Sequence, residues 1–199
     1  MYIEWRRQHR TGLRRTQESL VPLYERTHLF RVYCSNVIPG FFQTAGYADA
    51  LLSAIRVFRG TFDDVGEAVA ARMRRNRILH TQNHRFAVLV EESALRYRLG
   101  DADVMAGQLG HLLDVMALPS VSFGVIPLSA GGRPMWALES FTIFDDDRVH
   151  VELLSAQVTV TTPGEIALYL HAFAKLAELA VYGQAARALI TTAVDALAN

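Results

Sequence analysis

The sequence predicts an α+β fold in which a small mixed, largely antiparallel β-sheet packs with amphipathic helices. Segments 86–90 and 121–126 are almost continuously apolar, as strands covered on both faces are. Residues 138–154 alternate apolar and polar side chains around three aspartates, which predicts a hairpin. Longer stretches repeat apolar residues at helical spacing.

Length, charge and cysteine content limit the class of protein. A chain of 199 residues with 51% hydrophobic composition can bury one sizeable core. We expect an N-terminal helical extension at residues 1–33 and a single α+β domain at residues 34–199. A formal net charge of zero argues against the broad cationic face of a dedicated nucleic-acid binder. No apolar run approaches the roughly 18 residues of a membrane span, no signal peptide is evident, and the single cysteine, Cys34, fits a reducing compartment. We therefore expect a cytoplasmic protein.

The first 33 residues contain more arginines than acids, together with a few apolar residues. Gly12 and Pro22 weaken or interrupt a helix there. The segment could touch phosphates, but we expect a solvated helix that docks on the domain.

Residues 37–52 predict a corner followed by an amphipathic helix. Pro39 and Gly40 turn the backbone, and Thr44 can cap the helix. Gln43 and Tyr47 follow the corner and are candidate ligand-binding residues.

Residues 61–84 predict a second helix with Asp64 in its first turn. The helix is crowded by arginines at positions 72, 74, 75 and 77. They could bind an anion, but we expect them to pair with acids or to remain in water. His80 and His84 have a spacing that can hold a metal, but no cysteine or acid is adjacent, so no metal site is predicted.

Segment 86–90 predicts a central strand that brings Glu92 to its end, where functional sites are often built. Asp101 can cap the helix that follows. Residues 127–136 then form the richest glycine and proline cluster, which ends at Trp136. This loop is either a lid over a ligand or an ordinary connection between strands. If it is a lid, Glu92 and Trp136 lie on the rim of one hollow.

Folding the hairpin about Asp146 pairs Thr142 with His150 and Ser140 with Glu152. One face is then apolar, and the other carries hydroxyl, imidazole and carboxylate groups. Three interpretations of that polar face are open: it is exposed to solvent, it lines a pocket, or it supplies a proton-transfer pair. Thr162, followed by proline and by a glutamate three residues later, predicts a capping box for the next helix. The final two helices could close the core or form a homodimer, and we expect them to close the core.

The segment PGFFQTAGYADALL, residues 39–52, resembles part of a domain of unknown function in actinobacterial helix-turn-helix regulators of the XRE type. That domain lies at their C-terminal end and is often placed beside small acidic partner proteins. Further matching pieces follow in the same order and extend the resemblance over roughly residues 25 to 190: Arg72, Arg75, Asn76 and Leu79; Val90–Leu95; Gln108, Leu109 and Leu112; Val125–Gly131; Phe141 and Thr142; Val151 and Glu152.

Three departures from the family's pattern are visible. Asn76 stands where glutamine is usual, and Gly183–Ala186 replace acidic and serine residues before the last helix. The helix-turn-helix, which lies upstream in the family, is not in this sequence.

The resemblance implies a small-molecule-sensing or regulatory domain, stand-alone or excised, without direct DNA binding. It would respond to a small-molecule ligand or a small acidic partner protein. The alternative is a biosynthetic enzyme of cyclase, isomerase or lyase type that acts on an apolar molecule through Glu92, His150 or Glu152. The sequence has no phosphate-binding glycine loop, cysteine pair or nucleophile elbow, and no cofactor is predicted. The candidate ligand-binding residues are Gln43, Tyr47, Glu92, Trp136, His150 and Glu152.

Overall fold

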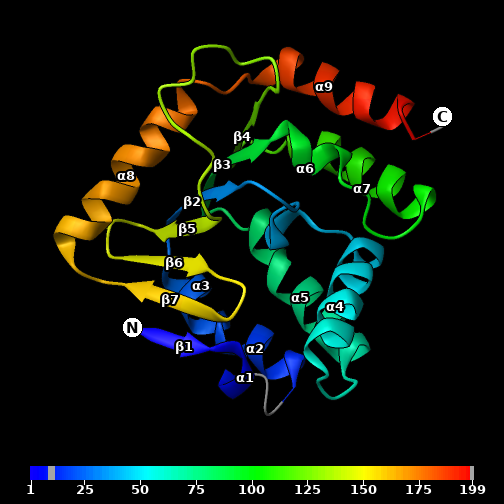
Figure 1. Cartoon of the computed structure of the whole chain (residues 1–199), viewed down its shortest axis with the longest axis vertical. Coiled ribbons are helices and arrows are strands. Elements are labelled where there is room, and N and C mark those ends of the chain that lie inside the picture. Colours follow the sequence, from blue (N-terminus) through cyan, green and yellow to red (C-terminus); the bar gives the residue numbers. More distant parts are fainter. Residues whose placement is uncertain (9–11, 198–199) are drawn as a thin grey trace.

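A seven-stranded sheet forms the centre of the chain (Figure 1). The computed structural model describes residues 1–8 and 12–197. Within them the strand order is β1-β7-β6-β5-β2-β3-β4, with β2 parallel to β3, β3 parallel to β4, and the other neighbours antiparallel. The predicted α+β fold with a mixed, largely antiparallel sheet is confirmed. The strands are β1 (Tyr2–Glu4), β2 (Leu29–Cys34), β3 (Arg85–Glu91), β4 (Val121–Ile126), β5 (Phe141–Phe144), β6 (Arg148–Glu152) and β7 (Ala156–Val160).

The predicted hairpin is strands β5 and β6. Thr142 lies opposite His150, and the amide of Glu152 donates to the carbonyl of Ser140, as the register predicted. Asp145 adopts φ 51° in the turn, a conformation that aspartate tolerates better than most residues.

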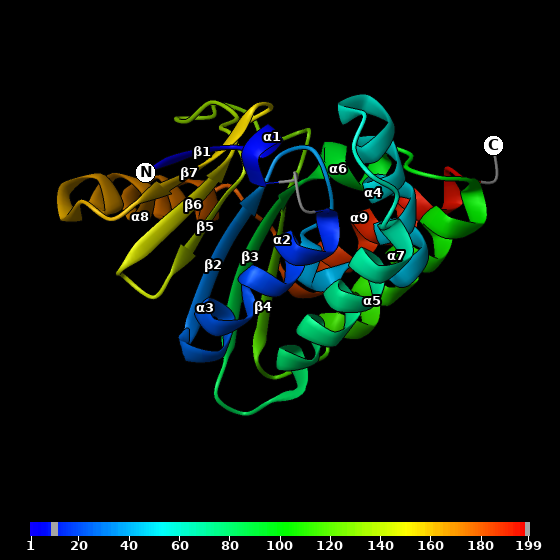
Figure 2. The ribbon, with the colours of Figure 1, turned by 90° about the horizontal axis from the view of Figure 1, so that it is seen from below.

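Helices cover both faces of the sheet. Their bounds are α1 (Trp5–Gln8), α2 (Leu13–Ser19), α3 (Val21–Arg26), α4 (Ala45–Arg59), α5 (Val65–Arg75), α6 (Glu92–Arg96), α7 (Ala102–Val115), α8 (Pro163–Ala177) and α9 (Gly183–Asp195), with short 3-10 turns η2 (Gly40–Phe42) and η3 (Asn76–His80). Figure 1 places α8 on one side of the sheet and α4 and α5 on the other, while Figure 2 shows α2 and α3 in front of β2 and β3.

Alternation along β3 explains the two cores. Val88 and Val90 belong to the larger core, which includes side chains of α3, α4, α7 and α9, whereas Leu89 belongs to the core beneath α8. Both sets are buried, so the predicted covered central strand is confirmed.

The structure confirms two of the three predicted helix caps. The side chains of Thr44 and Asp101 accept from the amides of Tyr47 and Val104, as predicted. Thr162 is at the expected N-cap of α8 but makes no capping hydrogen bond with its side chain, so that part of the prediction was wrong.

Asp64 also differs from its prediction, because it caps another helix. It precedes α5 but accepts from the amides of Leu13 and Arg14 in α2 at 3.0 and 2.8 Å. Gly12 has φ +93°, and a Cβ there would lie 2.3 Å from an oxygen of Asp64. Glycine at this position therefore permits the link between α2 and α5.

The first 33 residues are built into the sheet. Strand β1 forms one edge of the sheet and pairs with β7. The domain boundary expected between residues 33 and 34 falls inside β2, near the centre of the sheet. The segment thus supplies two strands besides its helices. No helix in the described part of the chain is both long enough and apolar enough to cross a bilayer.

Candidate functional site

A cavity of about 430 Å³ lies between the polar face of the β5–β6 hairpin, the N-terminal segment, α4 and α5. Its volume is within the range of about 300–1,000 Å³ that small-molecule pockets occupy. Apolar and aromatic residues outnumber polar residues in its lining, and the polar set is Thr16, Gln17, Asn36, Gln43, Arg59, Arg72, Arg75, Ser140, Thr142, His150, Glu152 and Gln157.

The two faces of the β5–β6 hairpin differ in polarity, and the polar face is turned toward the cavity. Ile143 and Val149 turn toward α8 and are fully buried in that core. Successive strand residues point to opposite faces, so Thr142, His150 and Glu152 point the other way and line the cavity. The polar face of the hairpin is therefore a cavity wall.

His150 is held as a neutral imidazole. Gln157 Nε2 donates to its Nδ1 at 2.8 Å, and the ring meets Phe144 edge-on at 4.7 Å. Burial, reinforced by the positive charge of Arg148, lowers the pKa of His150 to about 4. At neutral pH the ring adds no charge to the cavity.

Arg72 lines the cavity from α5 and is 9% exposed. Its Nε donates to Gln17 Oε1 at 3.1 Å, and its Nη1 donates to Gln43 Oε1. Gln43 is oriented in turn because its amide nitrogen donates to the carbonyl of Ile38 at 2.7 Å. Burial lowers the pKa of Arg72 to about 10, and the neighbouring Arg75 adds to that shift, so the guanidinium remains charged at neutral pH.

Arg75 lies one turn further along α5 and is 7% exposed. Its guanidinium carbon is 4.8 Å from the centre of the Tyr24 ring, a cation–π arrangement. Its Nε and Nη1 atoms are buried without a hydrogen-bond partner. Neither Arg72 nor Arg75 has a carboxylate oxygen within 4.0 Å among the described residues.

The charges around the cavity do not balance. Two arginines of α5, Arg72 and Arg75, line it with Glu152, the one acid among the described lining residues, so these side chains sum to two positive charges minus one, or +1. Arg59 lies over the ring of Trp5 at 4.9 Å. The cavity is thus electropositive.

The candidate ligand-binding residues fall into two groups. Gln43, His150 and Glu152 line the cavity together. Tyr47 is fully buried beside it, and its hydroxyl accepts from the amide of Ile38 at 3.2 Å. Burial raises the pKa of the Tyr47 hydroxyl to about 12. Because this hydroxyl bonds to the Ile38 amide, Tyr47 supports the corner at residues 38–40.

Glu92 and Trp136 do not line this cavity, so they are not brought together with Gln43, His150 and Glu152. Glu92 is buried at the start of α6, where it accepts from Arg96 Nη2 at 2.8 Å and from the Leu128 amide at 2.9 Å. Burial opposes its ionisation, but the bonds from Leu128 and Arg96 outweigh that effect and lower its pKa. Trp136 is 72% exposed.

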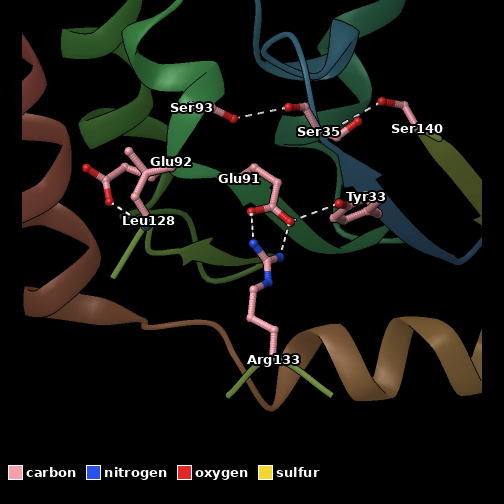
Figure 3. Close-up of polar contacts among 8 residues, drawn as sticks. All are labelled: Tyr33, Ser35, Glu91, Glu92, Ser93, Leu128, Arg133 and Ser140. Atoms are coloured by element: carbon pink, nitrogen blue, oxygen red, sulfur yellow. Dashed lines mark hydrogen bonds and ion pairs between the residues drawn. The ribbon is translucent and has the colours of Figure 1, made fainter. Parts of the chain in front are cut away.

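A second polar cluster lies where β2, β3 and the loop after β4 meet (Figure 3). Glu91, at the end of β3, accepts from Arg133 Nη2 at 2.5 Å, from Arg133 Nη1 at 3.2 Å, and from the Tyr33 hydroxyl at 2.9 Å. The loop that was expected to be a lid or a connection is thus attached to the sheet through Arg133. The charges of Glu91 and Arg133 cancel in this cluster, although Arg133 Nε is buried without a hydrogen-bond partner in the described part of the chain.

Sequence reasoning missed the burial of Arg72 and Arg75, which were expected to pair with acids or remain in water. A signal was present in the spacing. Residues three apart share a helix face, and on α5 the small residues Ala68 and Ala71 are buried beside the two arginines. Arg74, on the other side, is more than half exposed.

Comparisons with known proteins add a family and weak structural likenesses. A family model described as a domain of unknown function, DUF5753, matches residues 17–192. No curated protein matches the chain. TrmBL2, an archaeal chromatin protein with a novel mode of DNA binding, has 11% identity and a TM-score of 0.44, and the match covers 92% of this chain and 52% of that one. The chain therefore spans about half the length of TrmBL2.

Two other solved structures are similar at the same level. NucT from Helicobacter pylori has 10% identity and a TM-score of 0.48, over 92% of this chain and 98% of that one. Nuc from Salmonella typhimurium, a phospholipase D family member, has 9% identity and a TM-score of 0.43, over 84% and 90%. At these values the likenesses carry no functional argument.

Proposed function

From the premise that this chain belongs to the DUF5753 family, a domain of unknown function, we propose that it is a small-molecule-sensing domain. Its ligand would occupy the cavity between the hairpin and the N-terminal segment. The observation that carries the proposal is a pocket of about 430 Å³ lined by apolar residues, oriented amide groups and two buried arginines, Arg72 and Arg75, that have no carboxylate oxygen within 4.0 Å among the described residues. These are the features of a specific small-molecule site.

The N-terminal segment supplies the moving part in this proposal. Trp5, Gln17 and Tyr24 form part of the cavity wall, so a ligand touches them only when the segment is docked. Asp64 holds α2 in place through the amides of Leu13 and Arg14. Ligand binding would therefore shift the population toward the docked arrangement.

The regulatory part of the proposal follows from the resemblance to XRE-type regulators. In those proteins a DNA-reading module precedes the segment that here covers the cavity. A ligand that fixes this segment would then alter how an upstream module, or a separate partner protein, is held. We propose this coupling as the regulatory output.

Two features count against the enzyme alternative. His150, with its pKa lowered to about 4, is a weak base, and its Nδ1 already accepts from Gln157. Glu92 is held by Arg96 and Leu128 outside the cavity. Glu152 alone remains available as an acid or base inside it, and the sensing function accounts for more of the site.

A cavity-filling substitution tests the proposed function. Thr142 lines the cavity on β5, so Thr142→Tyr should occupy its volume while keeping a strand-forming residue. We expect native mass spectrometry to detect a small molecule retained by the full chain and lost from Thr142→Tyr. Ser122→Tyr, at an exposed position on β4 away from the cavity, is the matched control. Equal retention by both variants would place the site elsewhere.

A further inference from the structure

We infer that the ligand of this cavity is an amphiphilic anion: an apolar body carrying a carboxylate or a phosphate monoester that lies against Arg72 and Arg75. This inference rests on the proposed function, because it names the chemical class that the cavity receives. It is carried by the two buried guanidinium groups and by the lining that surrounds them.

Arg72 is oriented by neutral groups and has no carboxylate oxygen within 4.0 Å among the described residues, although the charge of Glu152 acts on it from further away. Gln17 and Gln43 each offer an amide oxygen, which orients the guanidinium without supplying a negative charge. Its Nη2 donates to no acceptor in the described part of the chain. A guanidinium fork left open in this way matches the oxygens of a carboxylate or phosphate.

Arg75 places a second positive charge beside the first. The Tyr24 ring stabilises one face of its guanidinium, yet two of its nitrogens stay enclosed without an acceptor. Arg75 also borders a smaller hollow that includes Glu18 and Glu25, and neither carboxylate comes within 4.0 Å of it. Burying a charge without a partner is costly, so an anion in the cavity would remove a cost that the protein itself leaves in place.

The rest of the lining defines the body of the ligand. Phe41 and Phe144 supply aromatic surface, and Leu51 and Ile55 supply aliphatic surface from α4. A fully hydrated ion such as inorganic phosphate would leave these walls unfilled. The site therefore suits a molecule that is apolar over most of its length and anionic at one end.

Isothermal titration calorimetry on the full chain with four probes of similar length tests the inference. The probes are decanoate, octyl phosphate, octanol and octyltrimethylammonium, used near neutral pH. We expect decanoate and octyl phosphate to bind about 10- to 100-fold more tightly than octanol, because hydrogen bonds to charged groups contribute that much, and we expect the cation not to bind. The ratio between the first two probes shows which anionic group the arginines prefer.

Substitutions then locate the anionic group. Arg75→Met and, independently, Arg72→Gln should each weaken binding of decanoate and octyl phosphate by about tenfold or more and leave octanol binding unchanged. Arg74→Met, one position away on α5 and more than half exposed, is the matched control and should bind every probe like the wild type. Circular dichroism on each variant confirms that it is folded, and either of the two tested variants suffices for the comparison.

The outcomes separate this inference from the proposed function. If octanol or the cation binds as tightly as the anions, the anionic class is wrong and ligand binding in the cavity still stands. If the anions bind equally well to the wild type, Arg75→Met and Arg72→Gln, the arginines are not their site, which overturns the inference. If none of the four probes binds, the inference is also overturned, while retention of a small molecule that Thr142→Tyr abolishes would still support the proposed function.

Discussion

The cavity and the cluster at the end of β3 bury charge in opposite ways. Glu91 and Glu92 each lie against an arginine, Arg133 and Arg96, and each accepts a further hydrogen bond from elsewhere in the protein. Across the sheet, Arg72 meets amide oxygens only. Arg75 meets an aromatic ring. In one region each buried acid forms an ion pair with an arginine, whereas in the other two buried arginines have no carboxylate oxygen within 4.0 Å among the described residues.

This difference helps to separate a structural polar cluster from a binding site. Pairing removes most of the cost of burying an ion, and breaking the pair by removing one partner restores it. Substitution of a buried ion that lacks an oppositely charged partner breaks no such pair. Substitutions in the two regions should therefore change the free energy of unfolding in opposite directions.

The largest effect is expected at the cluster at the end of β3. Arg133→Met removes the cation that Glu91 faces and leaves a carboxylate that is 4% exposed with only the Tyr33 hydroxyl as a partner. We expect the free energy of unfolding to fall by about 3 kcal/mol, measured by urea denaturation.

Arg96→Met is the comparison for that experiment. Glu92 would keep the Leu128 amide, and Arg96 is partly exposed, so the loss should be nearer to about 1 kcal/mol. Equal losses in the two variants would mean that Glu91 does not depend on its partner for burial.

A smaller effect is expected on changing the pH, because His150 is a group that the cavity wall keeps uncharged. Its folded pKa of about 4 lies below the ordinary value of 6.5. The folded state therefore binds fewer protons than the unfolded state between these values, and the contribution is complete above about pH 6.5 and is lost as the pH falls toward about 4. Lowering the pH from about 7 to about 5 should decrease the free energy of unfolding by about 2 kcal/mol through this residue.

His150→Asn isolates that contribution, because asparagine keeps an acceptor for Gln157 without titrating. The difference between the pH profiles of the variant and the wild type, each from urea denaturation, should equal the loss described. Parallel profiles would show that the imidazole is as solvated in the folded chain as in the unfolded one.

The smallest effect has the opposite sign. Arg75→Met should raise the free energy of unfolding of the ligand-free chain by about 1 kcal/mol, because an apolar side chain replaces a buried charge that lacks an anionic partner. Arg74→Met should change it by less than about 0.5 kcal/mol. A loss of stability in Arg75→Met would mean that the Tyr24 ring and the surrounding groups already compensate the charge.

Local signals in the sequence predicted the parts of the fold that depend on neighbouring residues. The register of the hairpin, the covered strand β3 and the caps at Thr44 and Asp101 all follow from residues within one or two turns or strands. The same local logic brought His150 and Glu152 to one face of the hairpin, which proved to be a cavity wall.

Other features depend on segments distant in sequence and could not be predicted from local patterns. Asp64 bonds to amides 51 and 50 residues earlier in the chain, so its own helix gave no indication of its partner. Arg72 and Arg75 are buried because α3 and the corner at residues 38–43 cover them. Glu92 was placed correctly at a strand end, but neither it nor Leu128, which bonds to it, lines the cavity.

The central position of β2 has a consequence for synthesis on the ribosome. Strand β2 can pair with β3 once residue 91 has emerged, but its other edge stays open until β5 and β6 follow, more than a hundred residues after it. Strand β1 remains without its partner until β7 has also been made. Such distant pairings slow folding, so the nascent chain carries an unprotected strand edge until most of it has been made, and the cavity is completed only after that edge is closed.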